Sequence, residues 1–142
     1  MSSKSKPLRD EVKRRFYPFV QGRGFIRQKS QDPYFVIFVR EANGRVDQFE
    51  LQWDKSWRPY FVLNFGSPER GEQPGRLQRR RGGDQWNWFS LRRPWAKKLI
   101  SGKWSYSPGQ VIDEVIAAFD ELETWWSTGI AGPHVYIYEL HA

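Results

Sequence analysis

Cysteine is absent from the chain, and histidine occurs only twice, as His134 and His141. Without thiols the chain can form neither disulfide bonds nor a zinc site with cysteine ligands, and it has no cysteine nucleophile. Neither histidine belongs to a cluster of metal-ligand residues or stands next to an obvious nucleophile, so neither predicts a metal site or a general base. We therefore expect no catalytic residue, no cofactor and no metal, and we expect that the protein is not an enzyme.

Long apolar runs are also missing, since no stretch approaches the roughly 18 apolar residues of a transmembrane helix. The first residues, Met1–Lys4, carry no apolar segment of the kind found in secretory signal peptides. A length of 142 residues suits one domain whose core is large enough to be stable without a metal or a disulfide. We expect a cytoplasmic protein without membrane contact, in which residues 1–142 form a single domain.

Charge is distributed unevenly along the chain, whose formal net charge is +7. Residues 1–30 carry nine basic and two acidic side chains, and residues 69–103 carry ten basic and three acidic ones. Residues 104–142 have six acidic side chains and no lysine or arginine. These blocks can neutralise one another within the fold or can leave a basic surface, and only the second arrangement implies an anionic partner.

Three strand-like runs rich in aromatic residues occupy residues 34–66. Asn43-Gly44 lies between alternating apolar residues and tolerates the positive φ angles of a two-residue type I′ turn, so it predicts a β-hairpin with a fixed register. The pairs predicted on the core face are Tyr34 with Trp53, Val36 with Leu51, Phe38 with Phe49, and Arg40 with Asp47. The run Tyr60–Gly66 should extend this face into an antiparallel meander. Glu50 belongs to the opposite, semi-polar face, where we expect an outward, solvated side chain.

Two helices are predicted, one near each end of the chain. Residues 7–21 have an apolar stripe interrupted by Pro18, which lacks a backbone N–H and should kink or end the helix. Residues 107–127 begin with a capping box of Ser107 and Gln110 and are followed by Gly129, a common helix stop. The apolar stripe of this second helix consists of Ile112, Val115, Ile116, Phe119, Leu122 and Trp126.

Short strands are predicted at Phe25–Arg27 and His134–Leu140, in addition to the meander. These elements predict an α+β fold, with an antiparallel sheet of about five strands around the meander and two helices packed on one face.

The segment 67–106 is basic and rich in glycine, proline and arginine, and it is longer than an ordinary connection. Arg76–Arg81 and Gln85–Leu91 are predicted to be short strands within it. Its arginines are interleaved with tryptophans, a composition typical both of protein–protein hot spots and of surfaces that bind single-stranded nucleic acid. The residues predicted to contact a partner are Arg79, Arg80, Arg81, Trp86, Trp88, Arg92, Arg93 and Trp95.

The order of these features carries a resemblance to a known family. A first helix leads into Gly24–Arg27, and it is followed by the meander, by the Arg-Leu-x-x-Arg pattern of Arg76–Arg80, by a tryptophan-containing strand and by an acidic helix. This order resembles an uncharacterised bacterial family of small α+β proteins of unknown function. Its members are similar in architecture to immunity-type proteins of bacterial toxin systems, which implies a protein-binding role and no catalytic residue.

The sequence leaves more than one class of function open. One class is an interaction protein, of which an immunity-type protein is one form. It would use the arginine and tryptophan segment or the semi-polar sheet face to contact a protein partner. The alternative is a module that binds single-stranded RNA or DNA through the same segment. An enzyme of unrecognised type and a small-molecule binder are further options, although no group of residues supports catalysis. We expect a protein partner, with nucleic acid as the alternative.

Overall fold

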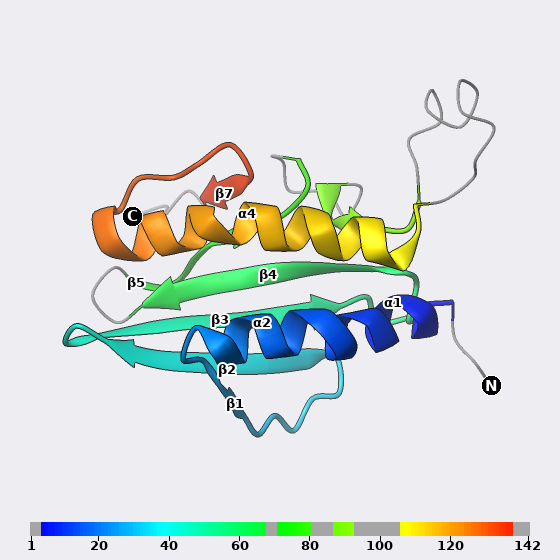
Figure 1. Cartoon of the computed structure of the whole chain (residues 1–142), viewed down its shortest axis with the longest axis horizontal. Coiled ribbons are helices and arrows are strands. Elements are labelled where there is room, and N and C mark those ends of the chain that lie inside the picture. The colour runs from blue at the N-terminus through cyan, green and yellow to red at the C-terminus, as the bar shows by residue number, and fades with distance from the viewer. Residues whose placement is uncertain (1–3, 68–70, 81–86, 93–105, 138–142) are drawn as a thin grey trace.

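A computed structural model describes residues 4–67, 71–80, 87–92 and 106–137 of the chain, with the backbone alone for residues 71–74. Within these residues the fold is α+β, with one seven-stranded antiparallel sheet (Figure 1). The strand order is β1-β2-β3-β4-β5-β7, and the short strand β6 pairs with the beginning of β4. The strands are β1 (Ile26–Gln28), β2 (Phe35–Ala42), β3 (Arg45–Trp53), β4 (Tyr60–Ser67), β5 (Gly71–Leu77), β6 (Phe89–Ser90) and β7 (Val135–Ile137).

The expected number of about five strands is wrong, because the described sheet has seven. The strands expected at Phe25–Arg27 and His134–Leu140 correspond to β1 and β7, although residues 138–140 lie outside the described part. The two strands beyond the expected five are therefore β5 and β6, both within the segment 67–106. Strand β5 covers Gly71–Leu77 instead of Arg76–Arg81, and its glycines and proline are residues that strand propensity disfavours. Of Gln85–Leu91, residues 89 and 90 form β6, and residues 85 and 86 lie outside the described part.

The predicted hairpin is confirmed residue by residue. Asn43 and Gly44 have φ angles of 54° and 76°, as a type I′ turn requires. Strands β2 and β3 pair in the predicted register, and β4 continues the meander beside β3. Along β3 the buried residues alternate with more exposed ones, as expected for a strand with one core face.

The N-terminal helix runs without a break from Lys6 to Gly22, as α1 (Lys6–Glu11), a π-helical stretch (Val12–Phe16) and α2 (Tyr17–Gly22). The helix does not end at Pro18, which lies in the first turn of α2. Its α-helical pattern changes before this residue, in the π-helical stretch, after which the Tyr17 N–H donates to the Val12 carbonyl oxygen five residues back. The apolar residues Leu8, Val12, Phe16 and Val20 are spaced by four, and on an ideal α-helix each step of four turns the side chain by roughly 40° away from the stripe. A π-helical turn holds more residues than an α-helical one and therefore offsets part of this rotation.

Helix α4 (Pro108–Thr128) has the predicted ends and the predicted stripe. The capping box of Ser107 and Gln110 is present, and Gly129 ends the helix with a left-handed φ of 80°. All six stripe residues lie in the core, with Ile116 only partly buried. These local signals were sufficient because each depends on residues within one helical turn of the helix end or on the 3.6-residue period.

Aromatic rings from both helical segments meet on one face of the sheet. The Phe49 ring on β3 lies 6.1 Å from that of Phe16 and 5.4 Å from that of Phe119 on α4, measured between ring centres. Phe25 and Trp126 join the same cluster, and all five residues are at most 2% exposed. The helices therefore leave the other face of the sheet, called the helix-free face below, without a described helix over it (Figure 1).

Candidate functional site

A row of side chains crosses the helix-free face at right angles to the strands. The register places one residue of each strand opposite the next, from β1 through β2, β3, β4 and β5 to β7. In this order the row consists of Gln28, Ile37, Glu50, Asn64, Arg76 and Tyr136. Residues that are directly paired on adjacent strands point to the same face, so the row brings together side chains from most of the chain.

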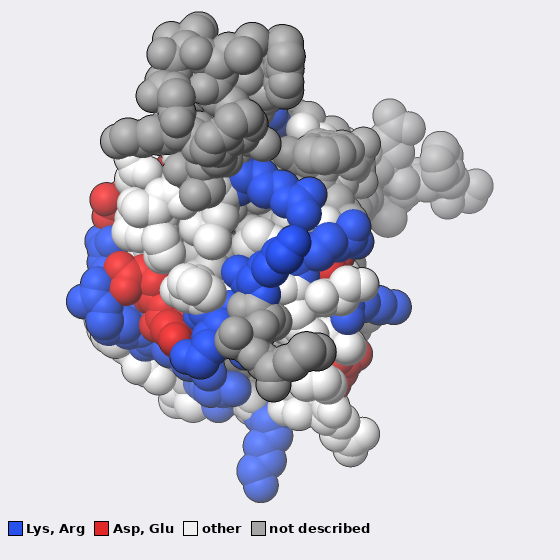
Figure 2. Space-filling view, turned by 90° about the vertical axis from the view of Figure 1, so that its right-hand side faces the viewer, with Lys and Arg blue, Asp and Glu red and all other residues white. Residues whose placement is uncertain are grey.

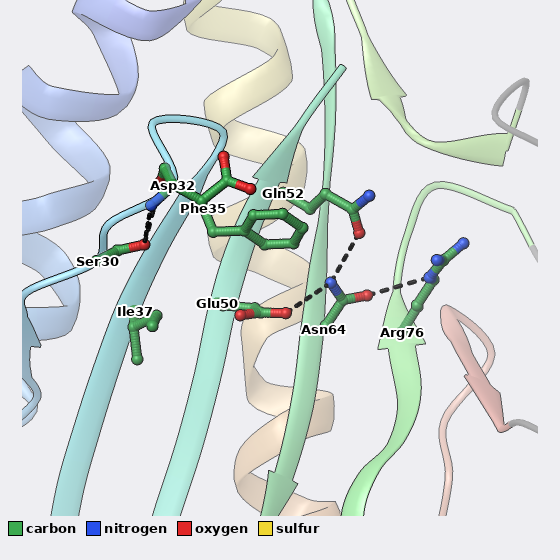
Figure 3. Close-up of a pocket in the computed structure, with 8 residues that line it drawn as sticks. All are labelled: Ser30, Asp32, Phe35, Ile37, Glu50, Gln52, Asn64 and Arg76. Atoms are coloured by element: carbon green, nitrogen blue, oxygen red, sulfur yellow. Dashed lines mark hydrogen bonds between the residues drawn. The ribbon is translucent and has the colours of Figure 1, made fainter. Parts of the chain in front are cut away.

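A hollow of about 380 Å³ lies along the middle of this row. Besides four residues of the row, its lining includes two residues of the turn before β2 and one further residue each from β2 and β3 (Figure 3). The complete lining is Ser30, Asp32, Phe35, Ile37, Glu50, Gln52, Asn64 and Arg76. The hollow thus combines apolar side chains at one end with carboxyl, amide and guanidinium groups, a mixture that can hold an amphipathic group.

Asn64 organises the polar part of the hollow and is itself only 6% exposed. Its Nδ2 donates to Glu50 Oε1 at 3.2 Å and to Gln52 Oε1 at 2.9 Å, while its Oδ1 accepts from Arg76 Nε at 3.1 Å (Figure 3). Because both ends of the amide are engaged, its orientation is fixed. The network holds four side chains of three strands in one arrangement, so the polar groups of the hollow are pre-positioned.

The expectation of a solvated Glu50 is wrong, since this side chain is only partly exposed and lines the hollow. Burial raises the pKa of the Glu50 carboxyl above its usual range; the hydrogen bond from Asn64 lowers that pKa and the charge of Asp32 raises it further. Sequence alternation assigned the correct face, but it could not show that neighbouring strands surround the carboxyl group. Asp47 lies on the opposite face with no exposed surface, so the two acids form no joint site.

A second cluster on the helix-free face adjoins the hollow and consists of Tyr60, Val62 and Trp88. The rings of Tyr60 and Trp88 meet edge to face at 6.1 Å. The guanidinium of Arg76 lies 5.6 Å from the centre of the Trp88 ring, so this arginine belongs both to the hollow and to the border of the cluster.

Two of the residues predicted to contact another molecule, Trp88 and Arg79, are instead engaged within the fold. Trp88 is 2% exposed and cannot offer its ring face to another molecule. Arg79 donates from Nε to Glu114 Oε2 at 2.7 Å and from Nη2 to the Ser90 carbonyl oxygen at 2.9 Å, which ties the end of β5 to α4 and β6. Its guanidinium also lies 4.6 Å from the centre of the Tyr106 ring. Both side chains therefore hold the fold together.

Arg80 and Arg92, by contrast, are exposed and form no ion pair with any residue that the structure describes. The other four predicted contact residues, Arg81, Trp86, Arg93 and Trp95, lie outside the described residues. Sequence reasoning did not single out Asn64, Gln52, Arg58 or Tyr60. For the first two, the only available signal was a polar residue within an otherwise apolar strand.

The acidic helix neutralises part of the basic charge inside the fold. Asp113 pairs with Arg15 at 2.5 Å and Asp120 pairs with Arg23 at 2.7 Å, and both pairs join the N-terminal helical segment to α4. Arg79 and Arg40 pair with further acids of α4. Several exposed cations that form no ion pair with a described acid lie away from α4, such as Arg27 on the edge strand β1 and Lys55 in the turn after β3.

The part of the chain that the structure describes contains neither a metal-binding cluster nor a membrane-spanning helix. Among the described residues, no group of three or more histidine, aspartate or glutamate side chains could hold a metal ion. In the same part of the chain, no helix is both long and apolar enough to cross a membrane.

Comparisons of the chain with protein-family models, with curated proteins and with solved structures found no match. Function has therefore to be inferred from the arrangement of the residues themselves.

Proposed function

We propose that the protein is an interaction module that contacts a protein partner through the helix-free face of its sheet, with the hollow at the centre of the contact. The observation that carries this proposal is the Asn64 network, which holds polar groups of three strands in fixed positions beside the apolar side chains of Phe35 and Ile37. A polar network next to an apolar patch is typical of protein–protein interfaces.

The extent of the face favours a protein over a small ligand. Six strands spaced by about 4.8 Å make the cross-sheet row roughly 24 Å wide. Apolar surface also continues beyond the hollow, because Ile26 on β1 is 67% exposed and is paired with Val39, which is partly exposed on the same face. A surface of this width is comparable to one side of an interface that buries about 800 Å² per partner.

An immunity-type role is part of this proposal and rests on the family resemblance of the sequence. A protein that acts by covering its target needs an exposed, pre-formed face, and it needs no catalytic group. The helix-free face supports such a role, because the core on the other side holds it rigid through the aromatic cluster around Phe49.

Site-specific photo-crosslinking tests the proposal in living cells of the source organism. A benzophenone amino acid replaces Gln48, which is exposed on the helix-free face of β3, and in a matched control it replaces Lys13, which is exposed on the N-terminal helix. We expect one adduct of defined mass from position 48, resistant to nuclease, and none from position 13.

The variant Ile37→Lys then tests the hollow itself. Lysine at this position lies opposite Glu50 and can pair with it, so the fold should survive while the apolar contact is lost. We expect the adduct from position 48 to fall at least tenfold, an effect of about 1.4 kcal/mol on binding. Equal adducts from positions 13 and 48, or an adduct that the Ile37→Lys variant leaves unchanged, would refute the proposal.

A further inference from the structure

Arginines gather around the Tyr60–Trp88 ring pair, where β4 begins. The guanidinium carbons of Arg58 and Arg92 lie 5.4 Å and 5.7 Å from the centre of the Tyr60 ring, and Arg76 covers the Trp88 ring. The backbone of Arg80 lies near Trp88, because the Arg80 N–H donates to the carbonyl oxygen of Asn87, the residue before Trp88. We call Arg58, Arg76, Arg80 and Arg92 the arginine strip.

Backbone pairing explains why arginines from distant parts of the sequence converge here. Strand β6 pairs with the beginning of β4, with Ser90 opposite Tyr60. The Leu91 N–H donates to the Pro59 carbonyl oxygen at 3.1 Å, and the Arg92 N–H donates to Ser90 Oγ at 2.9 Å. These bonds fix the backbone on both sides of Tyr60, so the position of the arginines follows from strand pairing.

The strip carries more positive charge than the described acids near it neutralise. Arg58 pairs with Asp54, whose carboxylate also accepts from two backbone N–H groups of the β3–β4 turn. Arg80 and Arg92 have no acidic partner among the residues described. Figure 2 looks at the end of the molecule where β4 begins, and a band of lysine and arginine side chains crosses the middle of that view.

We propose that the arginine strip is a binding site for the phosphate backbone of a single-stranded nucleic acid. Guanidinium groups bind phosphate oxygens through paired N–H donors, and aromatic rings beneath them limit the side-chain freedom that binding would remove. A single strand supplies one phosphate per nucleotide in a flexible chain, so it can neutralise several arginines of the strip without a matching folded surface.

The buried rings determine the mode of binding. Tyr60 is 7% exposed and Trp88 is 2% exposed, so neither offers a face on which a base can stack. The contacts are therefore made to phosphates, and the structure predicts binding with little sequence preference and a strong dependence on salt. This differs from the stacking by tryptophans that the sequence suggested. The strip shares Arg76 with the proposed protein contact, which centres on Glu50 and Asn64, whereas Arg58, Arg80 and Arg92 do not line the hollow.

The site is tested by fluorescence anisotropy with a labelled DNA single strand of mixed sequence and about 20 nucleotides, over a range of salt concentrations. The double variant Arg80→Gln/Arg92→Gln removes two exposed cations of the strip without disturbing the Arg58–Asp54 pair. The matched control, Arg27→Gln/Lys29→Gln, removes two exposed cations at the opposite edge of the sheet. Both variants lower the net charge equally.

We expect the strip variant to weaken binding about tenfold at low salt, as removal of two exposed charge pairs would. Its plot of log K against log salt should be shallower by about 1.4, since each phosphate contact of a single strand contributes roughly 0.7. The control should change the dissociation constant less than twofold. Equal loss in both variants, or no binding at low salt, would overturn the proposal. The proposal would also be overturned if poly-L-glutamate bound to the strip more tightly than the DNA strand does.

Discussion

Replacing Asp47 by asparagine should destabilise the protein far more than the loss of a single surface charge would. The Asp47 side chain has no exposed surface and accepts from Arg40 Nη2 at 2.6 Å and from Arg45 Nε at 2.8 Å. Arg40 in turn pairs with Glu123 of α4, and its guanidinium lies 4.3 Å from the centre of the Phe25 ring. The network thus joins the β2–β3 hairpin to α4 around a carboxylate that is itself fully buried, although Arg40, Arg45 and Glu123 are partly exposed.

The size of the effect follows from burial. Removing one partner of a buried ion pair costs about 3–5 kcal/mol, because the remaining charge stays buried. Arg40 keeps Glu123 in the variant, so we expect a loss at the lower end, about 3 kcal/mol. The matched control is Asp120→Asn, which breaks the Arg23–Asp120 pair of 2.7 Å, but there the carboxylate side chain is 71% exposed. Its loss should stay below about 1 kcal/mol.

Urea denaturation followed by tryptophan fluorescence measures both losses, and the melting temperature of Asp47→Asn should fall by roughly 6–12 °C. In 1 M NaCl the effect of Asp120→Asn should vanish and that of Asp47→Asn should persist, because salt screens exposed pairs. A loss below about 1 kcal/mol for Asp47→Asn, or one equal to that of the control, would refute the reasoning from burial.

Three further changes test other parts of the structure. Burial raises the pKa of Glu50, so its ionised form opposes folding, and Glu50→Gln should increase the free energy of unfolding at pH 8. The increase should vanish at about pH 3, below the ordinary pKa of the carboxyl, where the acid is mostly protonated in both states, and lower stability of the variant at pH 8 would contradict this. Ser107→Ala removes the acceptor of the helix cap and should cost about 1 kcal/mol in urea denaturation, and an unchanged midpoint would show that the cap is dispensable. In Gly75→Ala the new Cβ would lie 2.4 Å from the Tyr136 carbonyl oxygen, so β7 should separate from β5. Hydrogen exchange of the β7 amides should then accelerate while the β2–β3 hairpin stays protected, and unchanged β7 protection would refute the close approach.

Local signals account for the elements that could be predicted. The Asn43-Gly44 turn is a two-residue feature that sets the hairpin register, because a slip by one residue would turn every apolar side chain out of the core. The ends of α4 are equally local, since the capping box spans Ser107 to Gln110 and the stop needs only Gly129. Strand β5 could not be found in this way, because its pairing with β4 overrides a composition that disfavours strands.

The candidate sites depend on contacts between segments that are distant in sequence. Glu50, Asn64 and Arg76 become neighbours only when β3, β4 and β5 pair, and the strip forms only when β6 brings Arg92 beside Tyr60. Composition drew attention to the arginines and tryptophans after residue 78, but it could not tell a buried tryptophan from an exposed one. Trp88 and Arg80 lie in the same sequence segment, yet the structure buries the first and exposes the second.

The amino-acid sequence by itself determined the α+β class, the hairpin register, the ends of the last helix and the lack of thiol chemistry, because each depends on residue type and on neighbours a few positions away. Tertiary structure alone decided which charges of distant segments neutralise one another. Asp113 and Asp120 pair with arginines within and at the end of the N-terminal helix, whereas the Arg92 guanidinium lies over the Tyr60 ring and forms no ion pair with a described acid. The strength of a charge interaction is set by distance and by exclusion of water, and packing between distant segments controls both.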